Sequence, residues 1–122
     1  MAKVQKISQL QPTLGFTEFD IYASYRESFY SSELGKLYQA FPFSDFCRSI
    51  GLKDNVRGRK SYFTAEGKVA LMLLKSYTNF SDSELIEHLN GNIHYQLFCG
   101  ISIHPQFPLT NYKIVSDIRV EI

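Results

Sequence analysis

The chain has 122 residues, 44% of them hydrophobic, with ten Phe, eight Tyr and no Trp; this is typical of one folded domain and excludes disorder of the whole chain. Its net charge of +1 does not by itself indicate a nucleic acid, a membrane or an acidic protein as partner. No stretch approaches the roughly 18 consecutive apolar residues of a membrane span, and the first residues lack the apolar run of a signal peptide. We therefore expect a cytoplasmic protein with no membrane partner.

The first residues and the rest of the chain differ in pattern. Residues 1–17 are mostly polar and are interrupted by Pro12 and Gly15, which predicts a flexible N-terminal arm. From Glu18 onward, aromatic residues recur at steps of three and four, as they do on one face of a helix. The sequence therefore predicts an arm over residues 1–17 and a single helical domain over residues 18–122.

Two short helices are expected next. Ser31 or Ser32 can cap the first of them, and Pro42 ends it. Pro42 also suits the first turn of the following helix, which Gly51 ends. The side chains expected to point inward from this second helix are Phe43, Phe46, Cys47 and Ile50.

Thr64 precedes the most apolar segment of the chain and is a suitable N-cap for a helix over residues 65–78. The apolar surface of this helix is too wide for a helix with one buried side, so we expect it to be the central helix of the core. Gly67 lies near its start, where a glycine costs about 1 kcal/mol against alanine. A close approach by the backbone of a neighbouring helix would explain this glycine.

A second start signal follows closely. Ser81 and Glu84 form the S-x-x-E pattern of a capping box, and the helix that begins there ends at Asn90 and Gly91. Together with the preceding helix it makes a helix-turn-helix-like pair at about residues 65–90. A further short helix stops at Gly100.

The last segment is predicted to be a helix capped by Thr110, with Ile114, Val115 and Ile118 on one face. That apolar face continues to the last residues of the chain, which indicates a chain truncated before a further domain. No segment has the pattern of a strand. We therefore expect an all-α fold, a compact bundle of about five to six short helices.

Positive charge is concentrated in residues 53–60. Four cations and one anion fall in this segment, so it carries +3 while the rest of the chain sums to −2. It contains Gly58 and no apolar periodicity, which predicts an exposed basic loop. The four cations are Lys53, Arg57, Arg59 and Lys60.

Residues 52–119 resemble the N-terminal domain of bacterial insertion-sequence transposases. The match is long and distributed, although no single element of it is diagnostic. It consists of Gly58-Arg59 before a Tyr, the Leu-rich helix at 69–74, the Ser81-Asp82-x-Glu84-Leu85 start, Asn90, Tyr95, Phe98-Cys99-Gly100-Ile101, Pro108-Leu109-Thr110 and the helix with Ser116 and Arg119.

The resemblance implies a role in DNA transposition without catalysis by this fragment. Enzymes of that class carry three acidic residues and a divalent metal in an RNase-H-like domain that follows this region, and the chain stops before it. We therefore predict no catalytic residue, no cofactor and no small-molecule substrate for the fragment. Asp117 is accordingly not expected to belong to an acidic triad.

The helix pair and the basic loop are the two candidates for DNA contact. The exposed side of the second helix offers Asp82, Glu84 and Glu87, and no Lys or Arg occurs from residue 76 to 112, so phosphates would be repelled. The basic loop is the better candidate, because guanidinium groups suit phosphates and guanine edges. The alternative is a solvated loop whose arginines pair with the acidic helix. The predicted DNA-binding residues are Lys53, Arg57, Arg59, Lys60 and Ser61.

Two further possibilities are a metal site and an assembly module. Three histidines and two cysteines occur, but His94, Cys99 and His104 match no common zinc spacing, so we predict no metal site and two buried thiols in a reducing compartment. The alternative function is an assembly module without DNA contact. Its apolar face at Ile114, Val115 and Ile118 would be covered by a catalytic domain or, in a homodimer, by a second copy.

Overall fold

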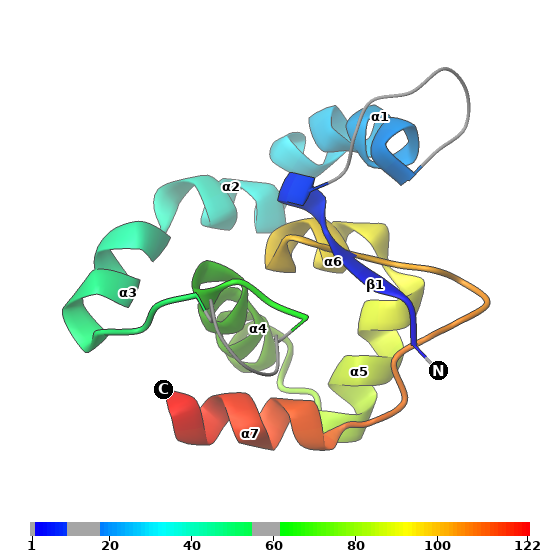
Figure 1. Ribbon diagram of the computed structural model, residues 1–122. Helices are drawn as coiled ribbons and strands as arrows, with labels where there is room; N and C mark the ends of the chain where they lie inside the picture. The colour runs from blue at the N-terminus through cyan, green and yellow to red at the C-terminus, as the bar shows by residue number, and fades with distance from the viewer. Residues whose placement is uncertain (1, 10–17, 55–61) are drawn as a thin grey trace.

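The computed structural model describes residues 2–9, 18–54 and 62–122, and within them the fold is a helical bundle (Figure 1). This confirms the predicted all-α class, with one helix more than the upper prediction. No helix in these ranges is long and apolar enough to cross a membrane. The helices are α1 (Glu18–Ser31), α2 (Glu33–Ala40), α3 (Phe43–Ile50), α4 (Ala65–Thr78), α5 (Asp82–Gly91), α6 (Ile93–Cys99) and α7 (Lys113–Glu121).

The predicted caps account for the starts of α2, α4 and α5. The Ser32 hydroxyl accepts from the Gly35 amide at 3.0 Å, and the Thr64 hydroxyl accepts from the Gly67 amide at 3.0 Å. Ser81 makes the full capping box with Glu84, with distances of 3.2 and 3.1 Å for its two hydrogen bonds. These bonds satisfy amides that have no partner inside their helix.

The core is centred on α4 and α6, which pack closely together. Leu71 and Leu74 of α4 are fully buried, which confirms α4 as a central helix. The seven-residue α6 also contacts α1, α2 and α5, so several elements meet on it. A Cβ atom at Gly67 would lie 2.6 Å from the Cys99 carbonyl oxygen, closer than real Cβ contacts occur. The close backbone approach predicted at Gly67 is thus confirmed, and α6 makes it.

A small antiparallel sheet corrects the prediction that no strand is present. Strand β1 (Val4–Lys6) pairs with β2 (Ile101–Ile103), with Gln5 opposite Ser102. Each strand has only three residues, too few to show an alternating pattern in the sequence. The sheet attaches the described start of the predicted arm to the domain, and a 3₁₀ helix (Ile7–Gln9) follows β1. Residues 10–17 of the arm lie outside the described residues.

Helix α7 starts later than predicted and its apolar face is covered. Thr110 is not its cap; Tyr112 occupies the N-cap position without a side-chain bond, and the Asn111 carboxamide oxygen accepts from the Lys113 amide at 3.1 Å. Val115 and Ile118 are 0% and 3% exposed, because α7 packs against α4 and α5. The face expected to await a partner is therefore filled by the chain itself.

Helix α3 buries fewer of its apolar side chains than predicted. Phe43 and Cys47 are buried as expected, but Phe46 and Ile50 are 37% and 41% exposed. Helix α3 packs chiefly against α4 and so buries only one side. The Phe46 ring lies against Phe41, with 5.7 Å between ring centroids, on the outer side of the helix.

Replacing Gly67 with alanine tests the contact between α4 and α6. The new methyl group would meet the Cys99 backbone, which cannot move aside as a flexible side chain would, so we expect Gly67→Ala to lower the free energy of unfolding by about 1–3 kcal/mol. Gly91→Ala is the matched control, since a Cβ there meets nothing within 4 Å. It should be neutral or stabilising by up to about 1 kcal/mol. Urea unfolding measures both, and stabilisation by Gly67→Ala would contradict the close contact.

A buried lysine joins α4 to α7. Lys68 is 2% exposed, and its Nζ lies 2.6 Å from Oε1 of Glu121, whose side chain is 39% exposed. A charge removed from water needs such a partner, because an unpaired buried ammonium is strongly disfavoured.

We expect Glu121→Ala to destabilise the fold by about 1–3 kcal/mol, less than for a fully buried pair because water still reaches Glu121. Lys68→Met, which keeps the volume and removes the charge, should be close to neutral, and the double variant should match Lys68→Met. Thermal unfolding with calorimetry provides the comparison. Equal losses in both single variants would argue that packing, rather than the unpaired charge, dominates.

Candidate nucleic-acid interface

The two helices predicted to form a helix-turn-helix-like pair are α4 and α5, which are joined by a tight turn. Asn79 ends α4 in the left-handed conformation, with φ of 61°, and its amide donates to the Lys75 carbonyl. Both helices pack against α6 and α7, which therefore take part in fixing their positions (Figure 1). The pair is thus built into the core of the domain.

The acidic side of α5 is partly neutralised by its neighbours. Asp82 Oδ1 lies 2.9 Å from the Lys75 Nζ and 2.7 Å from a nitrogen of the Arg119 guanidinium. The hydrogen bond from Lys75, helped by the charges of Lys75 and Arg119, lowers the pKa of the Asp82 carboxyl. Glu84 is engaged in the capping box, and the bond from the Ser81 amide lowers its pKa. Glu87 is exposed on the same helix.

This arrangement does not turn α5 into a basic helix. The cations nearest to its start, Lys75 and Arg119, are both paired with Asp82, so they hold the bundle together. His88 stacks on Phe80 with ring centroids 4.2 Å apart. The side of α5 that faces solvent therefore offers little attraction for phosphates.

The ion pairs of Asp82 predict an acid-dependent loss of stability. A pKa below the ordinary value of 3.8 means that the folded state favours the carboxylate. Its contribution is therefore present above about pH 4 and is lost as the pH falls through the lowered folded-state pKa. We expect Asp82→Asn to lower the free energy of unfolding by about 1 kcal/mol at pH 6 and to make no difference near pH 2. Glu87→Gln, on the same helix, is the control and should have little effect at either pH in urea unfolding. A Glu87→Gln loss as large as that of Asp82→Asn would point to the overall charge of α5.

The predicted basic loop joins α3 to α4, and the structure describes its two ends. Gly51, with φ of 72°, ends α3, and Lys53 after it is exposed. Asp54 Oδ1 accepts from the Ala65 amide at 2.6 Å, which places a carboxylate at the positive end of the α4 dipole. Thr64 caps the same helix, so both ends of the loop are fixed at the start of α4. The other predicted DNA-binding residues, Arg57, Arg59, Lys60 and Ser61, lie outside the described residues.

One further cation belongs to this region and was missed from the sequence. Arg48, in the last turn of α3, is three-quarters exposed and lies 3.5 Å from the similarly exposed Asp45. It lines a shallow hollow together with Lys53 and Asp54. Arg48 lies in the last turn of α3. A helical wheel of residues 43–50 would have identified it as an exposed cation close to the basic segment.

The thiols and imidazoles are dispersed. Cys47 and Cys99 are free and buried, as predicted, and burial raises the pKa of each thiol. His94 lies against Phe29, and His104 against Phe107. Within the described ranges, no three His, Cys, Asp or Glu residues are grouped so that they could hold a metal ion.

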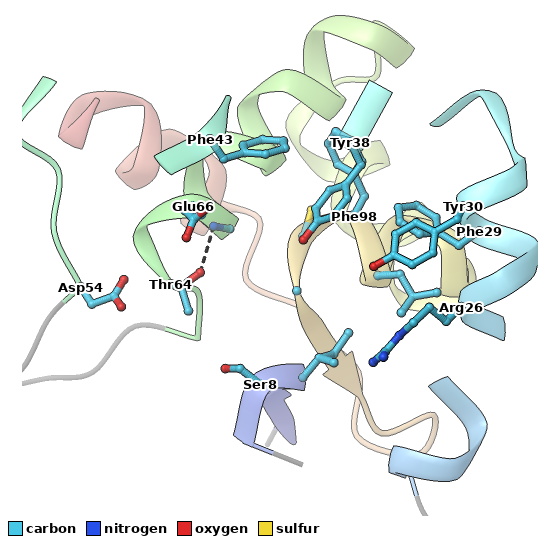
Figure 2. Close-up of a pocket in the computed structure, with 15 residues that line it drawn as sticks. Ser8, Arg26, Phe29, Tyr30, Tyr38, Phe43, Asp54, Thr64, Glu66 and Phe98 are labelled. Carbon is cyan, nitrogen blue, oxygen red and sulfur yellow. Dashed lines mark hydrogen bonds between the residues drawn. The ribbon is translucent and has the colours of Figure 1, made fainter. Parts of the chain in front are cut away.

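A cavity of about 450 Å³ lies between α1, α2, the first turn of α4 and the last turn of α6 (Figure 2). The sequence does not reveal this cavity, because its walls come from segments far apart in the chain. Aromatic rings of Phe29, Tyr30, Tyr38 and Phe98 form one side. Tyr38 stands among the other rings, with its ring centroid 5.6 Å from that of Phe29 and 5.7 Å from that of Phe98.

The polar groups of the cavity are arranged by charge. Asp54 and Glu66 lie on the side of α4, and Arg26 lies on the opposite side, on α1 (Figure 2). Burial, followed by the neighbouring Tyr30 and Glu66, raises the pKa of Tyr38, which keeps its hydroxyl protonated. The cavity thus combines ring surfaces, a hydroxyl and charges of both signs.

Comparison with known proteins gives one match. The family model described as Transposase domain (DUF772) matches residues 23–121. No curated protein and no solved structure matches the chain.

Proposed function

Since the chain belongs to the transposase domain family DUF772, we propose that it is a non-catalytic part of an insertion-sequence transposase that helps to bind transposon-end DNA. The basic segment at residues 53–60 makes the contact. The observation that carries this proposal is the concentration of charge, four cations and one anion in eight residues, in a segment that joins two helices of the core.

The attachment of the segment supports this role. Hydrogen bonds of Asp54 and Thr64 fix the chain on both sides of the segment to the start of α4, so the cations lie between two anchored points. Arginine forks bind phosphates or guanine edges in two places at once, and lysine adds a less directional charge. Lys53 at its start and Ser61 directly after it add contacts to the DNA backbone.

The helix pair has a supporting role in this proposal. Acidic Glu84 and Glu87 lie on the exposed side of α5, while Lys75 and Arg119 are paired with Asp82. Helix α5 therefore holds the bundle together next to the DNA and does not enter a groove. The metal-dependent chemistry of transposition belongs, in this proposal, to a separate RNase-H-like domain of the full enzyme that carries three acidic residues.

Removing the two arginines of the segment tests the proposal. We expect Arg57→Ala with Arg59→Ala to weaken binding of a random-sequence duplex at low salt and to reduce the slope of log K against log salt by roughly 2, because about one counterion is released per phosphate contact. Fluorescence anisotropy over a salt series measures this.

Lys36→Ala with Lys113→Ala is the matched control, since it removes two exposed cations outside the segment. It should leave the slope nearly unchanged. An unaltered slope in the arginine variant would remove the segment from DNA binding. If the wild-type chain does not bind duplex DNA at low salt, the proposal fails as a whole.

The alternative proposal is an assembly module, and the structure removes the main observation that favoured it. It relied on an uncovered apolar face at Ile114, Val115 and Ile118, and α4 and α5 cover Val115 and Ile118. A stable dimer in light scattering together with no DNA binding would favour assembly over DNA contact.

A further inference from the structure

The cavity and the basic segment share residues at the start of α4. Asp54 and Thr64, which fix the two ends of the segment, also line the cavity (Figure 2). Because the segment begins at Lys53, next to Asp54, DNA held there would lie close to the edge of the cavity that Asp54 forms. This shared edge restricts which ligands can reach the cavity.

The size of the cavity excludes a duplex and suits a small planar group. A volume of about 450 Å³ falls in the range of roughly 300–1,000 Å³ that takes small molecules. The major groove of duplex DNA alone is about 12 Å wide, so paired DNA cannot enter. A single base that has left the stack can, as in enzymes that extrude a nucleotide into a pocket.

The ring surfaces suit stacking with a base. Tyr30 is 41% exposed and Tyr38 is half-buried, so part of each ring is open to a ligand. Phe29 and Phe98 are almost fully buried and hold Tyr38 in place from behind. Bases stack on such rings with little dependence on their sequence.

The charges suit a nucleotide in one orientation. Carboxylates of Glu66 and Asp54 can accept hydrogen bonds from the amino groups of a base, while Arg26 on the opposite side can pair with its phosphate. We propose that this cavity receives one unpaired nucleobase of DNA bound at the basic segment, with Tyr30 and Tyr38 as the stacking surfaces. The inference rests on the proposed function.

Two DNAs that differ only in a base test the cavity. Both are the same short duplex with a two-nucleotide 3′ extension, which carries adenines in one and abasic sugars in the other. Their phosphates are equal in number, so binding by the basic segment contributes equally to both. We expect the chain to bind the adenine extension roughly tenfold more tightly, as stacking of one base provides.

Substitutions of exposed tyrosines locate the effect. Tyr30→Ala should abolish the preference for the adenine extension, and Tyr30→Phe, which keeps the ring, should retain it. Tyr112→Ala is the control, because Tyr112 is 54% exposed and does not line the cavity. It should leave the preference unchanged. Circular dichroism melting of each variant establishes that it folds like the wild-type chain.

The outcomes separate this inference from the proposed function. Equal binding of both extensions by the wild-type chain overturns the cavity proposal while DNA binding stands. Equal loss of preference in Tyr30→Ala and Tyr112→Ala also overturns it. No binding of either DNA at low salt overturns the proposed function and the cavity with it. Binding of free deoxyadenosine monophosphate without DNA binding would assign the cavity to a nucleotide and overturn its assignment to DNA.

Discussion

The contact between Gly67 and the Cys99 carbonyl sets the distance between α4 and α6, and the other elements are arranged around that pair. Because Gly67 has no Cβ, the first turn of α4 can lie directly on the last turn of α6. Gly100 then turns the chain, with φ of 71°, into strand β2, which pairs with β1. A side chain at Gly67 would separate the two helices and disturb the cavity wall and the sheet together. The cost of a glycine in a helix is thus offset by the close packing that it allows.

Charge in this domain has two separate uses. Lys68, Lys75 and Arg119 pair with Glu121 and Asp82, and these bonds join α4, α5 and α7 to one another. Each of these cations is paired with a carboxylate, so together they add little to the field that DNA would meet. The basic segment is different, because its cations are crowded along the chain where few anions accompany them. A near-neutral chain can therefore still concentrate positive charge in one segment of its sequence.

The two proposals assign complementary parts of one DNA molecule to neighbouring parts of the domain. Phosphates of the duplex meet the cations of residues 53–60, and an unpaired base enters the cavity beside Tyr30. Both meet at the first turn of α4, where Asp54 and Thr64 are held. The helix pair that looks most like a DNA reader is, in this arrangement, the support for the contact beside it.

The sequence by itself determined the helical class, the family, and the caps at Ser32, Thr64 and Ser81, because each cap joins a side chain to an amide only a few residues away. The reason for Gly67 could also be anticipated, although not the identity of its neighbour. Only the tertiary structure decided the sheet, the covered face of α7 and the ion pair of Asp82 with Arg119, since these join residues far apart in the chain. The same holds for the cavity, whose rings come from α1, α2 and α6. For the candidate DNA site, the charge of the segment follows from the sequence, whereas the fixing of its ends by Asp54 required the fold, because the α4 amide that Asp54 binds is brought to it by packing.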